Sequence, residues 1–536
     1  FLFDELPTGR FSISDARVTF RDLATGRGPW TFARVGLTLQ RRADSMRLDG
    51  TAELPSALGK QMQFAARSSG RLDDPTALNW DFEVESRDLA LAGLADLLPD
   101  AWPAPTTGNG SFKVAGVLHG AEIESLKGTV SLAGIMLPLP VWSTPLPGAD
   151  PLVIRSGEAD DAVVQTVPSG PAPQATSVVG NTQRIAYDVV RADFDVRHTA
   201  DGGWHLLVDG LQLVRPGVRW DPSRIEVDVD GPAAGAVSLR GSAAFLSLDG
   251  VWPLLAYLPE RADTARLRSL AAQGRLRDAA FAFRRATADA SPEYSFSGKI
   301  EEVGFSPVGA APGLDGITGQ FVATDRSGRF DLAARNFGFN LPRLFREPLL
   351  TDEVSGTITW AREADRWRIA SDAVAVRDAD GKGTARFTFD LPDDGSSPVL
   401  DLEGAGTDID ATATPRYLPA GRMSARSLAW LDRAFPAGRV ATASIVYRGP
   451  TRLFPFRGDE GTFIARGNFD GITLDYDPRW LPLVDARGDV EFHNEGLTAR
   501  AASGQVHGLR VSQGQVDIAD FRSLELDIRA QGNGDL

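Results

Sequence analysis

The sequence predicts a mainly β protein, an elongated and repetitive body built on a mostly antiparallel sheet with a few short helices. Three observations support this fold class: apolar and polar residues alternate in many short runs, turn residues separate the runs, and a pattern recurs at long range. At 536 residues the chain is longer than one ordinary compact domain. We therefore expect several blocks or one extended body.

Alternation with a period of two is the dominant signal. In residues 224–230, Ile225, Val227 and Val229 share one side of an extended chain, and four charged residues share the other. Similar runs occur at 204–209, 387–390, 489–493 and 524–529. This pattern is typical of antiparallel strands with one apolar face and one face in water.

Turn residues are frequent and helical patterns are rare. Gly and Pro together make 89 of 536 residues, about one in six against an average of roughly one in eight. Asp-Gly pairs such as Asp49-Gly50 and Asp209-Gly210 separate the alternating runs. Helical spacing is confined to 91–98, 263–273 and 427–435. These helices are too few and short for parallel crossovers, so we expect antiparallel pairing.

A long-range repeat divides the chain into blocks. The triplets Leu97-Leu98-Pro99, Tyr257-Leu258-Pro259 and Tyr417-Leu418-Pro419 recur 160 residues apart. Gly274 and Gly438 are 164 residues apart, and Gly298 and Gly467 are 169 apart. We predict the same strand order in 259–335 and 419–502, because the order of the matches is kept.

We expect four blocks with boundaries at 1–99, 100–258, 259–418 and 419–536. The second block contains an excursion at 143–182 that is rich in Pro, Gly and Ser. The chain opens on Phe1-Leu2-Phe3 without a Met, so we interpret it as an internal segment of a longer protein.

Composition excludes several functional classes. The formal net charge of −15 argues against nucleic acid as a partner, because phosphate binding needs a concentrated basic surface. The sequence contains no Cys, so disulfides and thiolate chemistry are excluded. No stretch approaches the roughly 18 consecutive apolar residues that span a bilayer.

Candidate catalytic or metal-binding patterns are weak. No nucleophile elbow, phosphate-binding loop or zinc-protease motif is present. Glu226, Asp228, Asp230 and Gly231 match the start of a calcium loop, but the position of its final Glu ligand is Val237. We interpret these acids as the wet face of a strand. The histidines show no metal-ligand spacing; they are His119, His198, His205, His493 and His507. We predict no catalytic residue, no metal site and no cofactor.

One region resembles a known family. Residues 417–511 contain an ordered series of matching segments, namely 427–438, 447–449, 453–456, 461–463, 474–476 and Trp480-Leu481-Pro482. This series resembles the YhdP-type family of AsmA-like envelope proteins, relatives of TamB. Leu481 separates Trp480 from Pro482, whereas the family usually has Trp directly before Pro. Residues 37–59, in the first block, resemble the same family's opening domain.

The resemblance implies a fold and a role. The family is similar in design to bridge-like lipid-transfer proteins, with a sheet curled into an open trough. The chain would be the periplasmic portion of a protein anchored in the inner membrane. It would move phospholipids between the inner and outer membranes and so support the outer-membrane barrier. Its partners would be phospholipids and the two membranes, reached through parts of the protein outside this sequence.

Alternating apolar residues in the best-repeated strands are the candidates for the lining of the groove. They are Phe281, Phe283, Ile445, Tyr447, Ile472, Leu474, Val490 and Phe492. The same residues are equally compatible with the dry core of a packed sandwich, and their spacing does not separate the two interpretations.

Two other functions are compatible with a β-rich chain. A scaffold that assists outer-membrane protein assembly, as in TamB-like relatives, would offer exposed strand edges beside filled sheets. A glycan-acting enzyme on a β-solenoid would need carboxylates that converge in a cleft. A wide, continuous apolar face would favour the lipid conduit.

Overall fold

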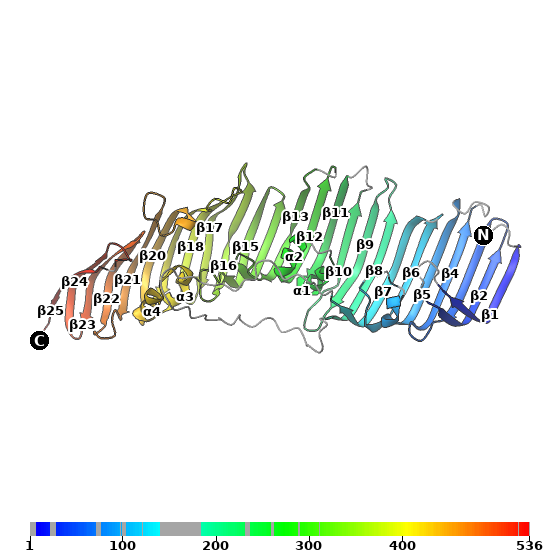
Figure 1. Ribbon diagram of the computed structural model, residues 1–536, viewed down its shortest axis with the longest axis horizontal. Helices are drawn as coiled ribbons and strands as arrows, with labels where there is room; N and C mark the ends of the chain where they lie inside the picture. The colour runs from blue at the N-terminus through cyan, green and yellow to red at the C-terminus, as the bar shows by residue number, and fades with distance from the viewer. Residues whose placement is uncertain are drawn as a thin grey trace, which may run out of the picture. The chain divides into compact units, whose positions relative to one another are not determined.

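The computed structural model describes residues 7–21, 28–70, 77–96, 98, 103–120, 122–139, 184–230, 236–258, 262–287, 290–309, 311–523 and 525–534 (Figure 1). These residues form 25 strands and a few short helices, which confirms a mainly β fold. The chain divides into two compact units. Unit 1 comprises Phe1–Ser269 and Arg284–Ala290, and unit 2 comprises Leu270–Phe283 and Ser291–Leu536. The expected excursion at 143–182 lies outside the described residues.

Unit 1 is an antiparallel meander in which each strand pairs with the next strand along the chain. Its strands are β1 (Gly9–Phe20), β2 (Trp30–Arg41), β3 (Ser45–Glu53), β4 (Gly59–Ser69), β5 (Asn79–Ala90), β6 (Thr107–His119), β7 (Glu122–Pro138), β8 (Arg184–His198), β9 (Trp204–Val214), β10 (Ser223–Val229) and β11 (Val237–Ser247).

Unit 2 repeats this topology. Its strands are β12 (Gln273–Arg285, of which the residues up to Phe283 belong to the unit), β13 (Glu293–Phe305), β14 (Gly313–Thr324), β15 (Ser327–Asn340), β16 (Leu349–Arg362), β17 (Arg366–Asp378), β18 (Gly381–Pro392), β19 (Val399–Asp410), β20 (Ala437–Pro450), β21 (Thr462–Leu474), β22 (Leu483–His493), β23 (Gly496–Val506), β24 (Leu509–Ile518) and β25 (Asp527–Asn533). From β13 onward, consecutive strands pair antiparallel. Among the described residues, no pairing closes either meander into a barrel.

The helices are short, and each follows the end of a strand or another helix. In unit 1 they are η3 (Leu91–Asp96), α1 (Leu248–Val251), η4 (Trp252–Tyr257) and α2 (Ala262–Ser269); in unit 2 they are η5 (Ala411–Ala413), α3 (Thr414–Tyr417), η6 (Ala420–Arg422), α4 (Ala425–Ala434) and η7 (Thr451–Leu453). The helices predicted at 91–98, 263–273 and 427–435 correspond to η3, α2 and α4. The sequence did not predict the helical turns at 248–257 and 411–422.

Helix α4 shows how a helix is fixed at the end of a strand. Its N-cap residue Ser424 accepts a hydrogen bond from the Ser427 backbone N–H at 3.1 Å. Trp430 donates its indole N–H to the Tyr476 carbonyl at 2.9 Å. The Asp432 carboxylate pairs with Arg346 at 2.6 Å. The helix is therefore tied both to the chain after β21 and to the loop before β16.

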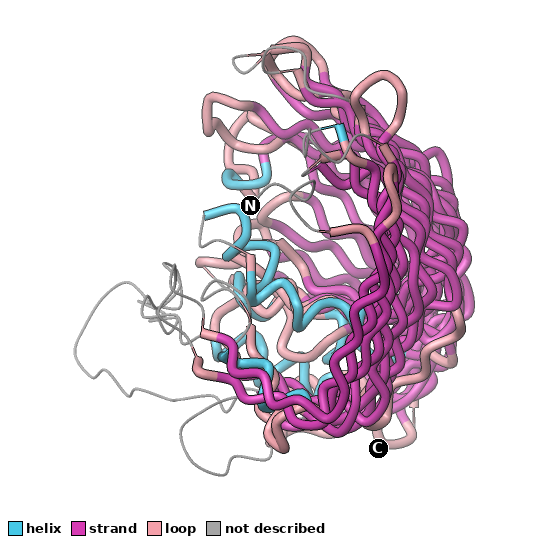
Figure 2. Tube along the Cα trace, turned by 90° about the vertical axis from the view of Figure 1, so that its right-hand side faces the viewer, coloured by secondary structure: helices cyan, strands magenta, loops and turns pink. Residues whose placement is uncertain are grey.

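Buried apolar residues concentrate at the strand ends where these helices pack. In unit 1, Leu89, Leu91, Ile135, Ile185 and Tyr187 form a buried cluster, against which residues of η3 and η4 pack. A smaller cluster in unit 2 consists of Ala411, Ile472 and Ala486, with Phe435 packed against it. We call these strand ends the helix-covered edge of each unit, and the opposite strand ends the open edge. Figure 2 shows most of the helices along one side of the curved strands; η7 is an exception, because it follows the other end of β20.

Bulges bend the strands near the helix-covered edge. Asp88, Glu302, Asn336, Asp408 and Asp485 have φ between 48° and 61°. A residue in this left-handed conformation adds one position to its strand, and the strand bends there. The register shifts between Ser86 and Leu89 in β5, and between Ile300 and Val303 in β13. The bulges therefore contribute to the curvature of each sheet (Figure 2).

A glycine opposite a bulge recurs in both units, and in three cases the strand of the glycine follows a helix. Gly108, Gly274 and Gly438 have φ of 120°, 103° and 118°, and each begins a strand. A Cβ at these positions would lie 3.2 Å from the Ile135 Cα, 2.7 Å from the Val303 Cα and 2.5 Å from the Ile472 Cα, respectively. The positive φ and the close approach both require glycine. We call each such pair a glycine–bulge lock, because it fixes the pairing of two strands at one position.

The locks support the predicted repeat. Helix α2 is followed by β12–β15 in the block at 259–335, and α4 is followed by β20–β23 in the block at 419–502. Gly274 and Gly438 occupy the same place in the two blocks, as do Val303 and Ile472. The two blocks therefore have the same order of elements, as the sequence predicts. The block boundaries at 99, 258 and 418 stay a proposal.

We predict that Gly438→Ala lowers the stability of unit 2, because alanine cannot adopt this φ without strain and its Cβ would meet the Ile472 backbone. The expected loss is about 2 kcal/mol or more. Gly383→Ala is the matched control, since its Cβ would have its closest neighbour at an ordinary 3.4 Å. Chemical denaturation, with hydrogen exchange of β20 and β21, measures the difference. Equal effects of the two substitutions would contradict the lock.

Candidate functional site: the apolar face

In unit 1, one row of paired residues crosses all eleven strands without a polar side chain. Residues paired across antiparallel strands point to the same face of the sheet. The row contains Ile13, Leu37, Gly50, Phe64, Val84, Val114, Gly128, Phe194, Val208, Ile225 and Ala243. It defines what we call the apolar face of unit 1.

The neighbouring row, one residue along each strand, points to the opposite face. It contains Ser12, Thr38, Asp49, Ala65, Glu83, Ala115, Lys127, Asp195, Leu207, Glu226 and Ser242. This is the polar face. Because adjacent residues alternate sides, a one-residue slip of any strand would put charges among the apolar side chains.

Unit 2 has an apolar face of the same kind. A row from β15 to β25 contains Ala334, Val354, Val376, Gly383, Gly406, Ala443, Gly467, Val490, Ala499, Val516 and Ile528. The adjacent row contains Arg335, Glu353, Arg377, Lys382, Thr407, Thr442, Asn468, Asp489, Arg500, Gln515 and Arg529. The two units therefore present the same division into an apolar and a polar face.

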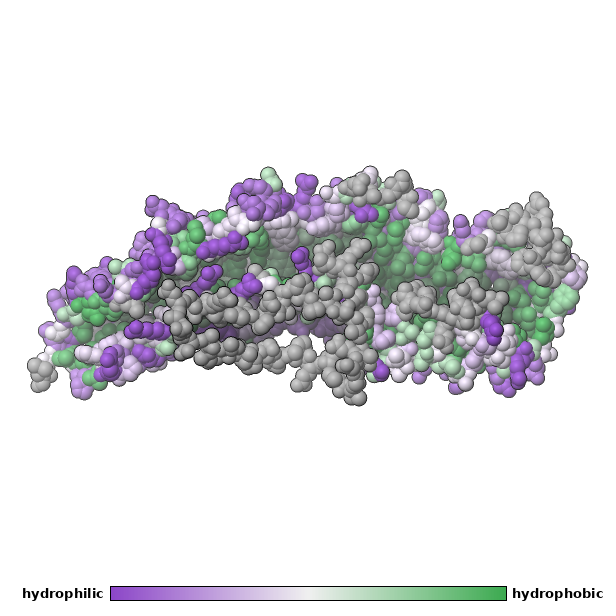
Figure 3. Space-filling view, in the orientation of Figure 1, coloured by the Kyte–Doolittle hydropathy of each residue, from purple (hydrophilic) through white to green (hydrophobic). Residues whose placement is uncertain are grey.

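The apolar rows are not sealed into a dry core. In the unit 1 row only Ala243 is buried, and Ile13 is 53% exposed. In the unit 2 row Ala334, Val354 and Gly467 are buried, and the other residues, such as Val376, Val490 and Val516, are at least partly exposed. Figure 3 shows apolar residues lying in a hollow of each unit, with polar residues along the rims. A packed sandwich would bury the middle of such a row, so these faces have room for a further apolar group.

Glycines opposite aromatic rings flatten the apolar face. A Cβ on Gly50 would lie 2.2 Å from the Phe64 ring, and one on Gly128 would lie 2.9 Å from the Phe194 ring. In unit 2, Gly328 has the same relation to Trp360, at 2.1 Å. Each ring therefore lies across a glycine of the neighbouring strand, where no side chain could fit. The rings form part of a wall and do not project from it.

Three of the predicted groove residues lie together on the apolar face of unit 2. Val490 belongs to the eleven-strand row, and Ile445 pairs with Ala465, which pairs with Phe492. All three are half-buried. The small residues Gly467 and Ala499 flank Val490 on the neighbouring strands, so the apolar face has space on both sides of the Val490 side chain. Their role in a groove stays a prediction.

Phe281 and Phe283 lie at alternate positions of β12, and both are half-buried. Two observations place β12 beside β13: Arg277 pairs with Glu301 at 2.9 Å, and Lys299 pairs with Asp278 at 2.8 Å. We therefore expect both phenylalanines to extend the apolar face of unit 2 toward its first strand.

The other three predicted residues are more enclosed. Tyr447 is 9% exposed, and its ring lies 5.2 Å from Phe456, 5.8 Å from Phe454 and 6.4 Å from Phe463. Ile472 is 5% exposed in the cluster at the helix-covered edge, with Leu474 packed against it. These residues are on the same face as Val490, but other side chains already cover Tyr447 and Ile472.

The family model described as YhdP protein matches residues 5–536. The chain belongs to the YhdP family. It is 23% identical over 343 residues to the intermembrane phospholipid transporter YhdP of Escherichia coli (strain K12), a match that covers 62% of this chain. The chain spans 27% of the length of that relative. No solved structure matches.

In the part of the chain that the structure describes, no helix has the length and the apolar character needed to cross a bilayer. The described segments of this YhdP family member consist of the two amphipathic sheets and their short helices.

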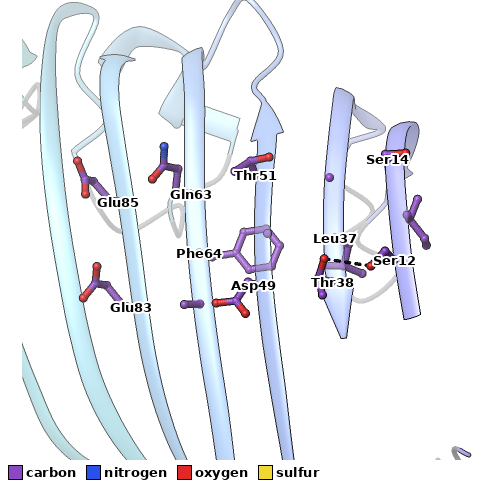
Figure 4. A pocket seen from close by; sticks show the side chains of 14 residues that line it. Ser12, Ser14, Leu37, Thr38, Asp49, Thr51, Gln63, Phe64, Glu83 and Glu85 are labelled. Atoms are coloured by element: carbon purple, nitrogen blue, oxygen red, sulfur yellow. Dashed lines mark hydrogen bonds between the residues drawn. The ribbon is translucent and has the colours of Figure 1, made fainter. Parts of the chain in front are cut away.

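A hollow of about 560 Å³ lies over the polar face of β1–β5 (Figure 4). Its acidic side chains are already paired, since Asp49 contacts Arg47 at 2.7 Å and Glu83 contacts Lys113 at 2.8 Å. Ser12 and Thr38 share a hydrogen bond of 3.3 Å. Among the described residues, no group of three or more potential ligands could hold a metal ion. The hollow also touches Ile13, Leu37, Gly50 and Phe64 of the apolar row, but its polar side chains belong to the polar face.

The calcium-like acids also lie on the polar face. Asp228 pairs with His205 across β9 and β10, and the His205 Nδ1 lies 2.7 Å from the Asp228 Oδ1. Glu226 belongs to the polar row of unit 1. The acids therefore lie on the side of the strand that faces solvent, as the alternation predicts.

Sequence reasoning did not single out a buried tyrosine and an arginine at the helix-covered edge of unit 1. Tyr187 is 2% exposed and donates a hydrogen bond to the Gly250 carbonyl at 2.7 Å. Burial raises the pKa of Tyr187 to about 12. The Arg215 guanidinium lies 6.0 Å from the centre of the Tyr187 ring. A single arginine after a strand carries no sequence signal, so only the fold reveals this pair.

We predict that Phe456→Ala destabilises unit 2 by about 3–5 kcal/mol, because it removes a ring that is 1% exposed from the cluster around Tyr447. Trp480→Ala is the control, since Trp480 is 67% exposed and its loss should change stability by less than about 0.5 kcal/mol. Denaturant unfolding measures both. A neutral Phe456→Ala would mean that this cluster is loosely packed and that Tyr447 is open to a ligand.

Proposed function

We propose that this chain transfers phospholipids by holding their acyl chains against the apolar faces of its two units. The observation that carries the proposal is the pair of apolar rows, each eleven strands long, mostly half-buried and free of polar side chains. The name of the Escherichia coli relative, intermembrane phospholipid transporter, agrees with this cargo. Because the chain spans 27% of that relative, it would supply a segment of the whole path.

The physical chemistry of the apolar face suits acyl chains. Each methylene moved from water to an apolar surface gains about 0.8 kcal/mol, so an acyl chain of about 16 carbons gains on the order of 10 kcal/mol. The rows consist of aliphatic residues, glycines and aromatic rings, so neighbouring positions differ little in the groups that they present. The acyl chains of a lipid would therefore pass from strand to strand without meeting a specific site along these rows.

The polar face supports a position in water between two membranes. Charged residues cover it, many of them in cross-strand ion pairs such as Arg377 with Glu353 and Arg466 with Glu491. We propose that the chain lies in the periplasm, as the portion of an inner-membrane-anchored protein that bridges toward the outer membrane. Phospholipids and the two membranes would be its partners.

The rival functions have less support. A scaffold with filled sheets would bury the apolar rows, but most of their middle positions are half-buried. A glycan-acting enzyme needs carboxylates that converge in a cleft. The hollow of unit 1 has carboxylates, but Asp49 and Glu83 are paired with Arg47 and Lys113. These observations favour the lipid conduit.

We predict that Val490→Asp leaves unit 2 folded but lowers phospholipid uptake about tenfold or more, because the new carboxylate would lie against the acyl chain. Uptake of an acyl-labelled phospholipid from vesicles by the purified chain measures this, with mass spectrometry of the lipids that copurify. Thr442→Asp is the control: it adds the same charge on the polar face, and uptake should not change.

A second variant separates an open face from a packed core. Ile472→Asp should unfold the helix-covered edge of unit 2, since Ile472 is 5% exposed within a cluster. Thermal unfolding distinguishes it from Val490→Asp. The proposal fails if Val490→Asp also loses its fold, or if it takes up lipid as the unmodified chain does.

A further inference from the structure

Arg215 has an unusual set of contacts at the helix-covered edge of unit 1. It follows β9 directly and forms an isolated bridge with Val218. One of its terminal nitrogens, Nη1, donates to the Asp249 carbonyl of α1 at 2.7 Å. Its Nε is buried and has no hydrogen-bond partner. Among the described residues, Arg215 forms no ion pair with a carboxylate.

The surroundings of Arg215 are apolar. Its guanidinium lies 6.0 Å from the centre of the Tyr187 ring, which is 2% exposed. Tyr187 pairs with Ile135, and both belong to the buried cluster that includes Leu91. Burial raises the pKa of the Tyr187 phenol to about 12, which reflects the poor solvation of charge at this place.

An unpaired cation in such a place requires a counter-charge. A partly buried charge is costly unless it is paired and its donors are satisfied. The protein supplies Arg215 with one carbonyl and the face of one ring, and neither group neutralises its positive charge. The bonding capacity of Arg215 is therefore incomplete in the protein alone, and an anion with two oxygens on one atom suits the planar donor fork.

The position of Arg215 relative to the apolar face identifies the class of anion. Leu213, two residues earlier, pairs with Val190 on the apolar face, and the contact with Tyr187 places Arg215 on the same side. Arg215 therefore lies where the apolar face ends at a strand terminus. A lipid whose acyl chains lie against Leu213 and Val190 would present its phosphate at this edge.

We infer that Arg215 binds the phosphate of a phospholipid headgroup, so that unit 1 holds each lipid in one orientation. This inference rests on the proposed function and deepens it, because it separates the recognition of the headgroup from the shielding of the acyl chains. The Tyr187 ring and the Asp249 carbonyl hold the guanidinium in place, and they act as positioning groups.

The test compares two labelled lipids that differ in the phosphate. The purified chain is incubated with phosphatidylethanolamine vesicles that contain either acyl-labelled phosphatidylglycerol or acyl-labelled diacylglycerol. We expect Arg215→Gln to lower the retention of phosphatidylglycerol about tenfold and to leave diacylglycerol within about twofold. Arg215→Lys should give an intermediate loss, since it keeps the charge but not the planar fork.

The matched control is Arg191→Gln. Arg191 is an exposed residue of β8 that pairs with Gln212, next to Val190 but on the polar face. The Arg191→Gln substitution removes the same charge from the same unit, so both lipids should be retained normally. Thermal unfolding of each variant is recorded alongside, because loss of the Asp249 contact alone could loosen α1.

Each remaining outcome has a definite meaning. Normal retention of phosphatidylglycerol by Arg215→Gln, or an equal loss of both lipids, overturns the headgroup assignment and leaves the proposed function standing. If inorganic phosphate raises the melting temperature of the unmodified chain while the two lipids are affected alike, Arg215 is a site for a free anion and the assignment fails. If the unmodified chain takes up neither lipid, the proposed function itself fails.

Discussion

The register of the strands is the constraint on which the rest of the structure depends. An antiparallel sheet alternates its side chains with a period of two, so a slip of one residue exchanges the two faces. In unit 1, such a slip of β5 would place Glu83 where Val84 stands, between Phe64 and Val114. The glycine–bulge locks resist such slips, because only glycine tolerates the close approach at those positions. The apolar face is continuous because every strand keeps its register.

The ion pairs of the polar face act in a different way from the locks. Glu403 contacts both Arg386 and Arg448 from neighbouring strands, and all three side chains are at least partly exposed. Exposed pairs of this kind contribute about 0–1 kcal/mol each. Their main effect is to keep one face of each sheet hydrated, while backbone pairing and the clusters at the helix-covered edges stabilise the fold. Asp432 differs, because its pair with Arg346 joins a helix to a distant loop.

Much of this fold could be predicted from the sequence, and the parts that could not have a physical reason. The run at 224–230 correctly indicates β10, because its alternation needs no knowledge of neighbours. Bulges break that logic: Phe469 and Ile472 share the apolar face although they are three residues apart, because Gly471 adds a position with φ of 64°. The enclosure of Tyr447 depends on Phe454 and Phe456 returning to it, which the pattern within β20 does not contain. The pairing of Ile445 with Ala465, and of Ala465 with Phe492, likewise depends on register between strands.

The meander topology has a consequence for how such a chain can change in length. Each strand runs opposite to the one before it, so the glycine of a lock always lies at the beginning of one strand and its bulge near the end of the next. If a hairpin such as β17 with β18 were lost, the next strand would still start at the same edge and run in the same direction. Loss of one strand would reverse every strand that follows, and helices that now pack at one edge would emerge at the other. Insertions and deletions in this architecture should therefore occur in pairs of strands, so that the helices of the helix-covered edge stay at that edge.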